Sequence, residues 1–363
     1  MFSVNIVLPT ALPRIRRLGW LLAWAALPVL AAEPLELIPA TEADDTRQLI
    51  MLLQQQMERD YPHGHMLRDA HPKAHGCVRA EFVVAPDLPA ALRVGVFAAP
   101  RRYQAWLRFS NASGKVQADD VADLRGVAIK LLDVAGEPLA RDLQGAANQD
   151  FLLLSHPVLP VGNVADFLHL AQAVVNGSPV WFFLNPVDSH LRALKELLAA
   201  RQVHANPLQI RYWSTTPYQF GEQVTKYALR PLPPMPQDPV PDQRPPDFLR
   251  QAMVRQLQQQ PARFEFLLQL RTDPGTMPIE DASVEWDETR APMQRLATLT
   301  IPPQTFDSTA QLAACDAFNF NPWHSLPPHR PLGGINRARN PVYQALAGFR
   351  ASTNTERESS GKQ

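Results

Sequence analysis

The sequence has 363 residues, which is enough for one large domain or two ordinary ones. Hydrophobic residues make up 45% and charged residues 19%, a composition typical of a globular protein rather than a disordered one. Lysine plus arginine and aspartate plus glutamate number 35 each, so no overall field favours nucleic acid or cationic partners.

The N-terminal segment has the pattern of a secretory signal. A basic stretch, PRIRR, precedes an apolar run that is too short to span a bilayer comfortably, and small residues follow at Ala31 and Ala32. We expect residues 1–32 to be a signal peptide that contacts the membrane only during export. Residues 33–363 would then be a single soluble domain in the periplasm or outside the cell. An uncleaved membrane anchor is the alternative interpretation.

The first predicted element after the signal is a helix from about Asp44 to Asp60, because acidic residues come early and leucines recur at helical spacing. The next hundred residues contain short apolar or alternating runs separated by turn residues. This spacing predicts a meandering antiparallel sheet that can close into a barrel. The runs are 78–85, 92–99, 103–111, 124–134 and 149–157.

The second half of the chain returns to helical patterns, at 164–177 and 189–202. The proline-dense stretch 230–247 is incompatible with a helix or a central strand, so we expect a long extended connection that wraps the surface. The remaining predicted elements are a helix at 247–260, strands at 263–272 and 293–302, a last helix beginning near Asn340 with Pro341 in its first turn, and a frayed polar tail at 352–363.

The last predicted helix carries a tyrosine between two arginines. Arg339, Tyr343 and Arg350 are four and then seven residues apart, which places all three on one helix face. A phenol ordinarily loses its proton near pH ~10, and a neighbouring permanent cation favours the phenolate. This spacing suits a tyrosinate metal ligand. A surface arginine pair flanking a half-buried tyrosine explains it as well.

Near the start of the predicted sheet, two histidines lie among cations. Arg68, His71, Lys73 and His75 occupy eight positions before a strand-like run. Three interpretations are open: a metal site clamped by His71 and His75, a solvated basic turn, or the acid/base histidine of a cofactor enzyme. Pro72 makes helical geometry doubtful here, and a third metal ligand is missing.

The two cysteines, Cys77 and Cys315, lie far apart in the sequence. In an exported protein they can form a disulfide, and a pair of buried free thiols explains the count equally well. Neither cysteine has a second one nearby at the spacing of a zinc site.

Five short motifs follow one another between residues 60 and 350. They are R-x-x-H-x-K at Arg68–Lys73, R-F-S at Arg108–Ser110, D-x-R-G-x-A-x-K at Asp123–Lys130, an asparagine before an apolar strand at Asn148, and R-x-x-x-Y-x-x-x-x-x-x-R at Arg339–Arg350. In this order and with these internal spacings, the chain resembles the haem catalase family, in particular its short, exported, catalase-like members.

The resemblance implies an α+β fold with an antiparallel β-barrel core, helical cover and haem b as the cofactor. Tyr343 would be the axial ligand of the haem iron, with Arg339 holding it as the phenolate. On the opposite face His71 would act as the acid/base group toward peroxide. Other members of the site would be Asn148 as a hydrogen-bond donor to peroxide, Ser110 as the group that orients His71, and Arg68, Arg108 and Arg350 as partners of the haem propionates.

The implied function is a haem hydroperoxidase that decomposes hydrogen peroxide or reduces peroxides with a small organic donor. The apolar strand after Asn148 is aliphatic, LLL, where the family usually has phenylalanines. From this difference we expect a wider pocket that admits organic reductants. The alternatives are rearrangement of fatty-acid hydroperoxides, as in catalase-related allene oxide synthases, and a non-catalytic haem-binding protein of the cell envelope. The oligomeric state is left open.

Overall fold

The structure is a computed structural model, and residues 36–363 form one compact unit. It describes residues 35–142, 145–185, 189–232 and 239–361. The predicted signal peptide, 1–32, lies outside the described residues. Among the helices that are described, none combines the length and apolar character that a membrane crossing requires.

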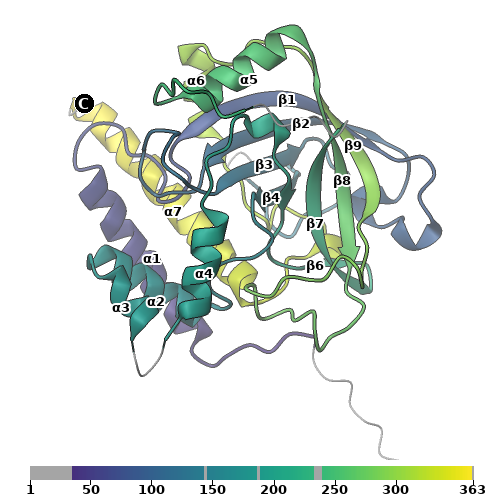
Figure 1. Cartoon of the computed structure of the whole chain (residues 1–363), viewed down its shortest axis with the longest axis horizontal. Coiled ribbons are helices and arrows are strands. Elements are labelled where there is room, and N and C mark those ends of the chain that lie inside the picture. The colour runs from purple at the N-terminus through teal and green to yellow at the C-terminus, as the bar shows by residue number, and fades with distance from the viewer. Residues whose placement is uncertain (1–34, 143–144, 186–188, 233–238, 362–363) are drawn as a thin grey trace, which may run out of the picture. The chain divides into compact units, whose positions relative to one another are not determined.

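Eight antiparallel strands close into a barrel, which confirms the predicted α+β fold with a barrel core (Figure 1). Neighbouring strands follow the order β5-β4-β3-β2-β1-β9-β8-β7, and β7 also pairs with β5 to close the ring, while β6 extends beside β7. The strands are β1 (Ala74–Val84), β2 (Arg102–Asn111), β3 (Arg125–Leu131), β4 (Gln149–Leu154), β5 (Tyr212–Trp213), β6 (Tyr218–Phe220), β7 (Gln223–Leu232), β8 (Ala262–Leu270) and β9 (Gln294–Ile301).

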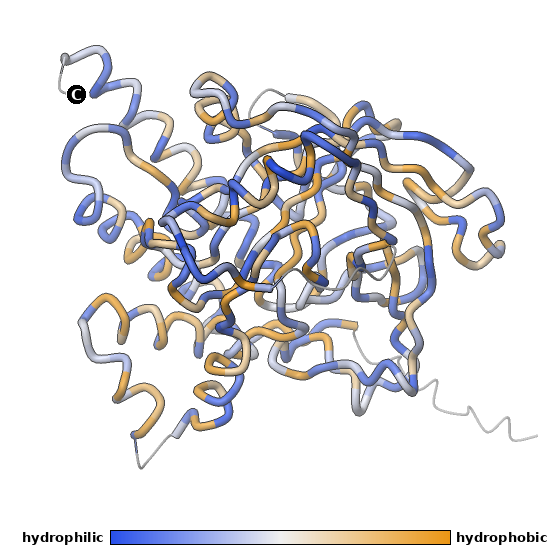
Figure 2. Tube along the Cα trace, turned by 45° about the horizontal axis from the view of Figure 1, so that its top comes forward, coloured by the Kyte–Doolittle hydropathy of each residue, from blue (hydrophilic) through white to orange (hydrophobic). Residues whose placement is uncertain are grey.

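Side chains fill the barrel, so the functional groups are found on its outer wall. Along β2 the residues Tyr103, Ala105, Leu107 and Phe109 belong to the buried core, because alternate side chains of a strand point to opposite faces. The intervening residues, Trp106, Arg108 and Ser110, therefore face outward. Figure 2 shows how hydrophobic and hydrophilic residues alternate along the chain trace.

The helices lie outside the barrel, and one group of them packs along one side (Figure 1). Helices α1, α2 and α7 share a cluster of buried apolar side chains that includes Leu49, Met57, Leu168 and Leu346. The helices are α1 (Glu42–Asp60), α2 (Val164–Val175), α3 (Pro179–Leu184), α4 (Leu191–Ala200), α5 (Phe248–Gln259), α6 (Thr309–Ala317) and α7 (Gly334–Ser359). Short 3-10 turns occur at η1 (Ala90–Leu92), η2 (Gly95–Phe97), η3 (Pro207–Gln209) and η4 (Pro327–His329).

One predicted strand is wrong: the run 92–99 contains the turn η2 and the last residue of the turn η1 instead. Gly95 has a left-handed φ of 53°, and a side chain there would collide with the ring of His329. The backbone N–H of Val96 donates to His329 Nε2 at 3.1 Å, so the segment bonds to a side chain instead of to a strand. The strand β7 and the short helix α6 were not predicted.

The last helix is much longer than predicted, which corrects both of its ends. It begins at Gly334, so Pro341 lies inside the helix rather than in its first turn. The expected frayed tail is helical to Ser359 because two side chains attach it to the chain after α1. Arg357 donates to the carbonyls of Tyr61 and Gly64, and Asn354 exchanges hydrogen bonds with the backbone of Met66.

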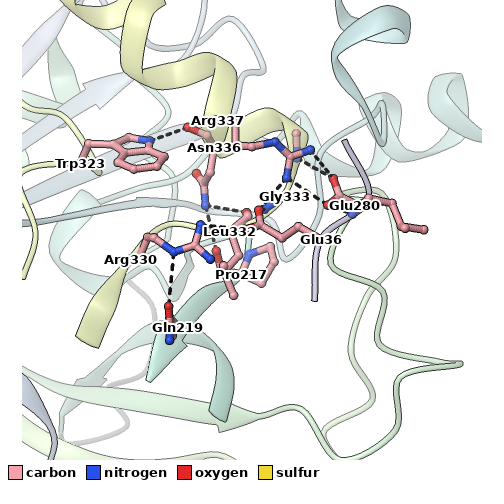
Figure 3. Close-up of polar contacts among 12 residues, drawn as sticks. Glu36, Pro217, Gln219, Glu280, Trp323, Arg330, Leu332, Gly333, Asn336 and Arg337 are labelled. Carbon is pink, nitrogen blue, oxygen red and sulfur yellow. Dashed lines mark hydrogen bonds and ion pairs between the residues drawn. The ribbon is translucent and has the colours of Figure 1, made fainter. Parts of the chain in front are cut away.

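An ion-pair network fixes the start of α7 (Figure 3). The guanidinium of Arg337 contacts the carboxylates of Glu36, Glu42 and Glu280 at 2.6 to 2.8 Å. Glu36 also accepts from Arg330 and from the backbone N–H of Gly333. Three acids on separate segments therefore position the helix that carries Arg339 and Tyr343.

A disulfide between Cys77 and Cys315 ties β1 to α6, which settles the question that the sequence left open. The two Cα atoms are 5.4 Å apart, while 238 residues separate the cysteines in the chain.

Candidate active site

A cavity lies between the outer wall of β2, β3 and β4 and the helix α7. Its empty volume, counted out to the solvent at its mouth, is about 970 Å³. Seven of the eight predicted site residues line it: Arg68, His71, Arg108, Ser110, Arg339, Tyr343 and Arg350. The fold thus brings together residues from segments almost three hundred positions apart.

His71 is held in one orientation by its neighbours. Its Nδ1 lies 2.9 Å from Ser110 Oγ, and its carbonyl accepts from Arg108 Nη2 at 2.7 Å. The residue has a left-handed φ of 58°, which a non-glycine residue adopts only when its surroundings impose it. A Cβ added at Gly126 would lie 2.6 Å from His71 Cε1, so the imidazole ring fills the space that a missing side chain leaves.

The imidazole of His71 is neutral near pH 7. Burial, together with the positive charges of Arg108, Arg339 and Arg68, lowers its pKa from 6.5 to about 3. A neutral ring has one nitrogen that accepts a proton. The contact with Ser110 occupies Nδ1, which leaves Nε2 for a molecule in the cavity.

Tyr343 is half-buried on α7, one turn after Arg339. Burial raises the pKa of the phenol, the negative charge of Asp69 raises it further, and attraction and hydrogen bonding to Arg339 lower it. The Arg339 guanidinium is itself fixed, since its Nη1 lies 3.1 Å from both Thr216 Oγ1 and Asn336 Oδ1. The net pKa is above the ordinary value, so Arg339 alone does not produce the phenolate, and a metal cation on the phenol oxygen would.

Three arginines at the cavity carry more positive charge than the nearby acids neutralise. Burial lowers the pKa values of Arg68, Arg108 and Arg350, and repulsion by neighbouring arginines lowers those of Arg68 and Arg108 further, that of Arg108 to about 10. The carboxylate of Asp316 lies 3.5 Å from Arg68, and burial raises the pKa of the other nearby acid, Asp69. Arg108 Nε is buried and has no hydrogen-bond partner among the residues that the structure describes. Such a group of cations is suited to a ligand with carboxylates.

Asn148 is not among the residues that line this cavity, and its role as a hydrogen-bond donor to peroxide stays a prediction. Its buried side chain donates to Asp142 Oδ2 at 2.7 Å. The register of β3 and β4 explains why Asn148 does not line the cavity. The cavity touches the strand pair at Gly126–Ala128 and at Leu152–Leu154. Asn148 lies next to the other end of β4. Four residues of strand amount to about 13 Å. The amide that does line the cavity is Asn319.

His75 and Lys73 do not line the cavity either. His75 Nε2 lies 2.8 Å from Asn111 Oδ1, and Lys73 forms an ion pair with the buried Asp119 at 2.7 Å. No cluster of three or more His, Cys, Asp or Glu side chains that could hold a metal ion occurs among the described residues. The geometry therefore separates the two histidines, with His71 at the cavity and His75 in a buried polar network.

The segment Phe318–Phe320 forms a cavity wall that sequence reasoning missed. It follows α6 directly, and a buried triad holds the chain just after it. Lys130 Nζ lies 2.9 Å from both oxygens of Asp150, and His324 Nδ1 lies 2.8 Å from the same carboxylate. The only sequence signal was that this stretch is rich in aromatic residues and proline.

Comparison with solved structures finds the same arrangement of strands and helices in catalases. A fungal catalase aligns with a TM-score of 0.64 at 15% identity, over 82% of this chain and 62% of the other. Catalase A from Saccharomyces cerevisiae aligns with a TM-score of 0.61 at 18% identity, over 83% and 63%. The fold is a catalase fold. A bacterial catalase gives 0.60 at 14% identity, over 83% of this chain and 60% of its own.

The chain therefore spans less than two thirds of the length of the catalases it matches. No family model matches the sequence, and no curated protein does. At identities of 14 to 18% the likeness establishes the catalase fold, and the catalytic assignment has to come from the cavity.

Proposed function

We propose that this protein is a haem hydroperoxidase that decomposes hydrogen peroxide or reduces peroxides with organic donors. The observation that carries the proposal is a single cavity in a catalase fold, lined by the Ser110–His71 pair, by Tyr343 with Arg339, and by an arginine cluster short of counter-charge.

The residues present fit haem b. Tyr343 would supply an oxygen ligand to the iron, and the cation would complete the stabilisation of the phenolate that Arg339 begins. Arg68, Arg108 and Arg350 would bind the two propionates, which would also give the orphaned Nε of Arg108 an acceptor. When bound, the haem would supply the redox chemistry that cleaves the O–O bond.

His71 would move the proton. Its pKa near 3 keeps the ring neutral at pH 7, so its free nitrogen would accept a proton from one peroxide oxygen and return it to the other oxygen, which would leave as water. Ser110 holds the ring for both steps. Asn319, the amide at the cavity wall, would donate the hydrogen bond to peroxide that the sequence assigned to Asn148.

Export to the periplasm or beyond the cell remains part of the proposal. The basic and apolar N-terminal pattern supports it, and so does the disulfide, because disulfides persist mainly in oxidising compartments.

A second candidate, rearrangement of fatty-acid hydroperoxides, is favoured by the aliphatic wall of Leu152, Leu154 and Leu346. The two reactions are separated by supplying hydrogen peroxide and a lipid hydroperoxide in turn. Oxygen release from the first supports the leading proposal, whereas an isomerised product from the second, without oxygen release, supports the alternative.

The decisive experiment is the haem content of the purified protein and of two variants. Tyr343→Phe should lose most of the Soret absorbance, since it removes the oxygen that would bind iron. Tyr103→Phe is the matched control, because its hydroxyl bonds to the Val96 carbonyl inside the barrel, away from the cavity. Equal haem content in all three proteins would overturn the ligand assignment. Haem bound without peroxide turnover would instead favour a non-catalytic binding protein.

A further inference from the structure

A second cavity adjoins the first, with Phe318 as their common wall. Its empty volume, again counted to the solvent, is about 900 Å³, and its lining includes Arg79, Trp106, Phe306 and Phe318. The proposed function gives this cavity no role.

The strand register explains why the two cavities are neighbours. On the outer wall of the barrel Cys77 of β1 lies opposite Arg108 of β2, and Arg79 lies opposite Trp106. Arg108 belongs to the first cavity, and both members of the next outward pair belong to the second. The disulfide between Cys77 and Cys315 fixes the end of α6 between them, just before Phe318. Figure 1 shows α6 beside β1.

The chemistry of the second cavity suits a flat aromatic ring that carries a negative charge. Trp106, Phe306 and Pro303 present apolar faces. The Arg79 guanidinium lies 5.6 Å from the centroid of the Trp106 ring. It makes no ion pair or side-chain hydrogen bond within the described part of the chain, so its positive charge is available to a carboxylate at the cavity mouth.

Aromatic side chains also connect this cavity with the first one. The ring centroids of Trp106 and Phe318 are 5.2 Å apart, and those of Phe318 and Phe320 are 5.9 Å apart. Phe320 lines the first cavity. Arg68, at that cavity, donates to the carbonyl of Phe318 at 2.5 Å and so fixes the wall from the other side. An electron could cross this wall without its donor entering the first cavity.

We propose that the second cavity binds the reducing substrate, and that this substrate is a phenolic carboxylate of the hydroxybenzoate or hydroxycinnamate class. The ring packs against Trp106 and Phe306, and the carboxylate pairs with Arg79. The proposal rests on the hydroperoxidase function proposed above. Each phenol gives up one electron and one proton, so two phenols and one hydrogen peroxide yield two phenoxyl radicals and two waters. The electrons cross by Trp106, Phe318 and Phe320.

The test measures binding of 4-hydroxycinnamate to the purified protein by calorimetry, alongside the neutral analogue 4-methylphenol. Arg79→Gln should raise the Kd of 4-hydroxycinnamate about three- to fivefold at low salt, the size expected for a partly exposed ion pair, and leave 4-methylphenol unchanged. Trp106→Leu should weaken both ligands about tenfold. Arg263→Gln, an exposed strand arginine outside both cavities, is the matched control.

Turnover provides the second readout. In Arg79→Gln the KM for 4-hydroxycinnamate should rise by the same factor, with kcat and oxygen release from hydrogen peroxide unchanged. Unchanged binding in both Arg79→Gln and Trp106→Leu overturns the site, as does binding that is lost only in the first-cavity variant Arg350→Gln. If the protein turns over no peroxide yet binds 4-hydroxycinnamate through Arg79 and Trp106, the proposed function fails and the ligand class of the site stands.

Discussion

Removal of the disulfide between Cys77 and Cys315 should destabilise the folded protein by several kcal/mol, about 3 to 5. Cys77 and Cys315 close a loop of 238 residues, so the bond excludes a large share of the conformations open to the unfolded chain. The chain-entropy relation gives about 18 cal/mol/K for such a loop, or about 5.5 kcal/mol at 25 °C. Measured losses fall below this limit, and we expect about 3 to 5 kcal/mol for Cys77→Ala with Cys315→Ala.

The assay is equilibrium unfolding in urea, followed by tryptophan fluorescence. The wild-type protein, the reduced wild-type protein and the double variant are compared at one pH, after thiol titration has confirmed the redox state of each. Reduced wild type and double variant should agree, because both lack the same constraint. A loss below about 1 kcal/mol in the double variant would refute the reasoning, since it would show that the loop is already constrained in the unfolded state.

Three further predictions concern the site and its support. Gly126→Ala should slow oxygen release at least tenfold, because the new methyl group would displace the His71 ring, and it should leave the haem content unchanged. The control is Gly348→Ala, because there is open space around the Cα of Gly348. The free energy of unfolding should fall as the pH drops from 6.5 toward 3. Over that range the unfolded chain protonates His71 and His329, whose pKa values burial lowers to about 3, whereas the native protein does not. His329→Gln should flatten this slope by up to about 1.4 kcal/mol per pH unit in urea unfolding. Arg337→Met should cost about 3 kcal/mol in the same assay, because it leaves three clustered carboxylates without their cation, and an unchanged midpoint would contradict that role.

Most of the regular structure followed from local sequence. The helices α1, α2, α4 and α5 and the strands β8 and β9 occur close to their predicted bounds, because hydrophobic periodicity and capping residues are local signals. Local signals failed where a distant group decides the backbone. His329 fixes the 3-10 turn η2 within the run 92–99, and contacts of Arg357 and Asn354 keep the polar tail helical.

The candidate site was predictable where residue type and spacing specify the chemistry. Helix period placed Arg339, Tyr343 and Arg350 on one face, and the resemblance to catalases singled out Arg68 and His71; all five residues line the cavity. The position of Asn148 relative to the cavity was not predictable, because it depends on the register between β3 and β4. Asn319 and Phe318 were not predicted, because an aromatic and proline-rich stretch does not by itself indicate a cavity wall, and the disulfide and the Lys130–Asp150–His324 triad hold this stretch in place.

The sequence by itself determined the barrel-forming runs, the tyrosine between arginines and the motif order that resembles catalases. Those features depend on the period of each element and on residue chemistry, which act over a few positions. Only the tertiary structure decided whether the cysteines are bonded and that a second cavity shares the Phe318 wall. These features depend on strand register and on contacts between segments hundreds of residues apart. Such contacts produce no periodic pattern in the sequence.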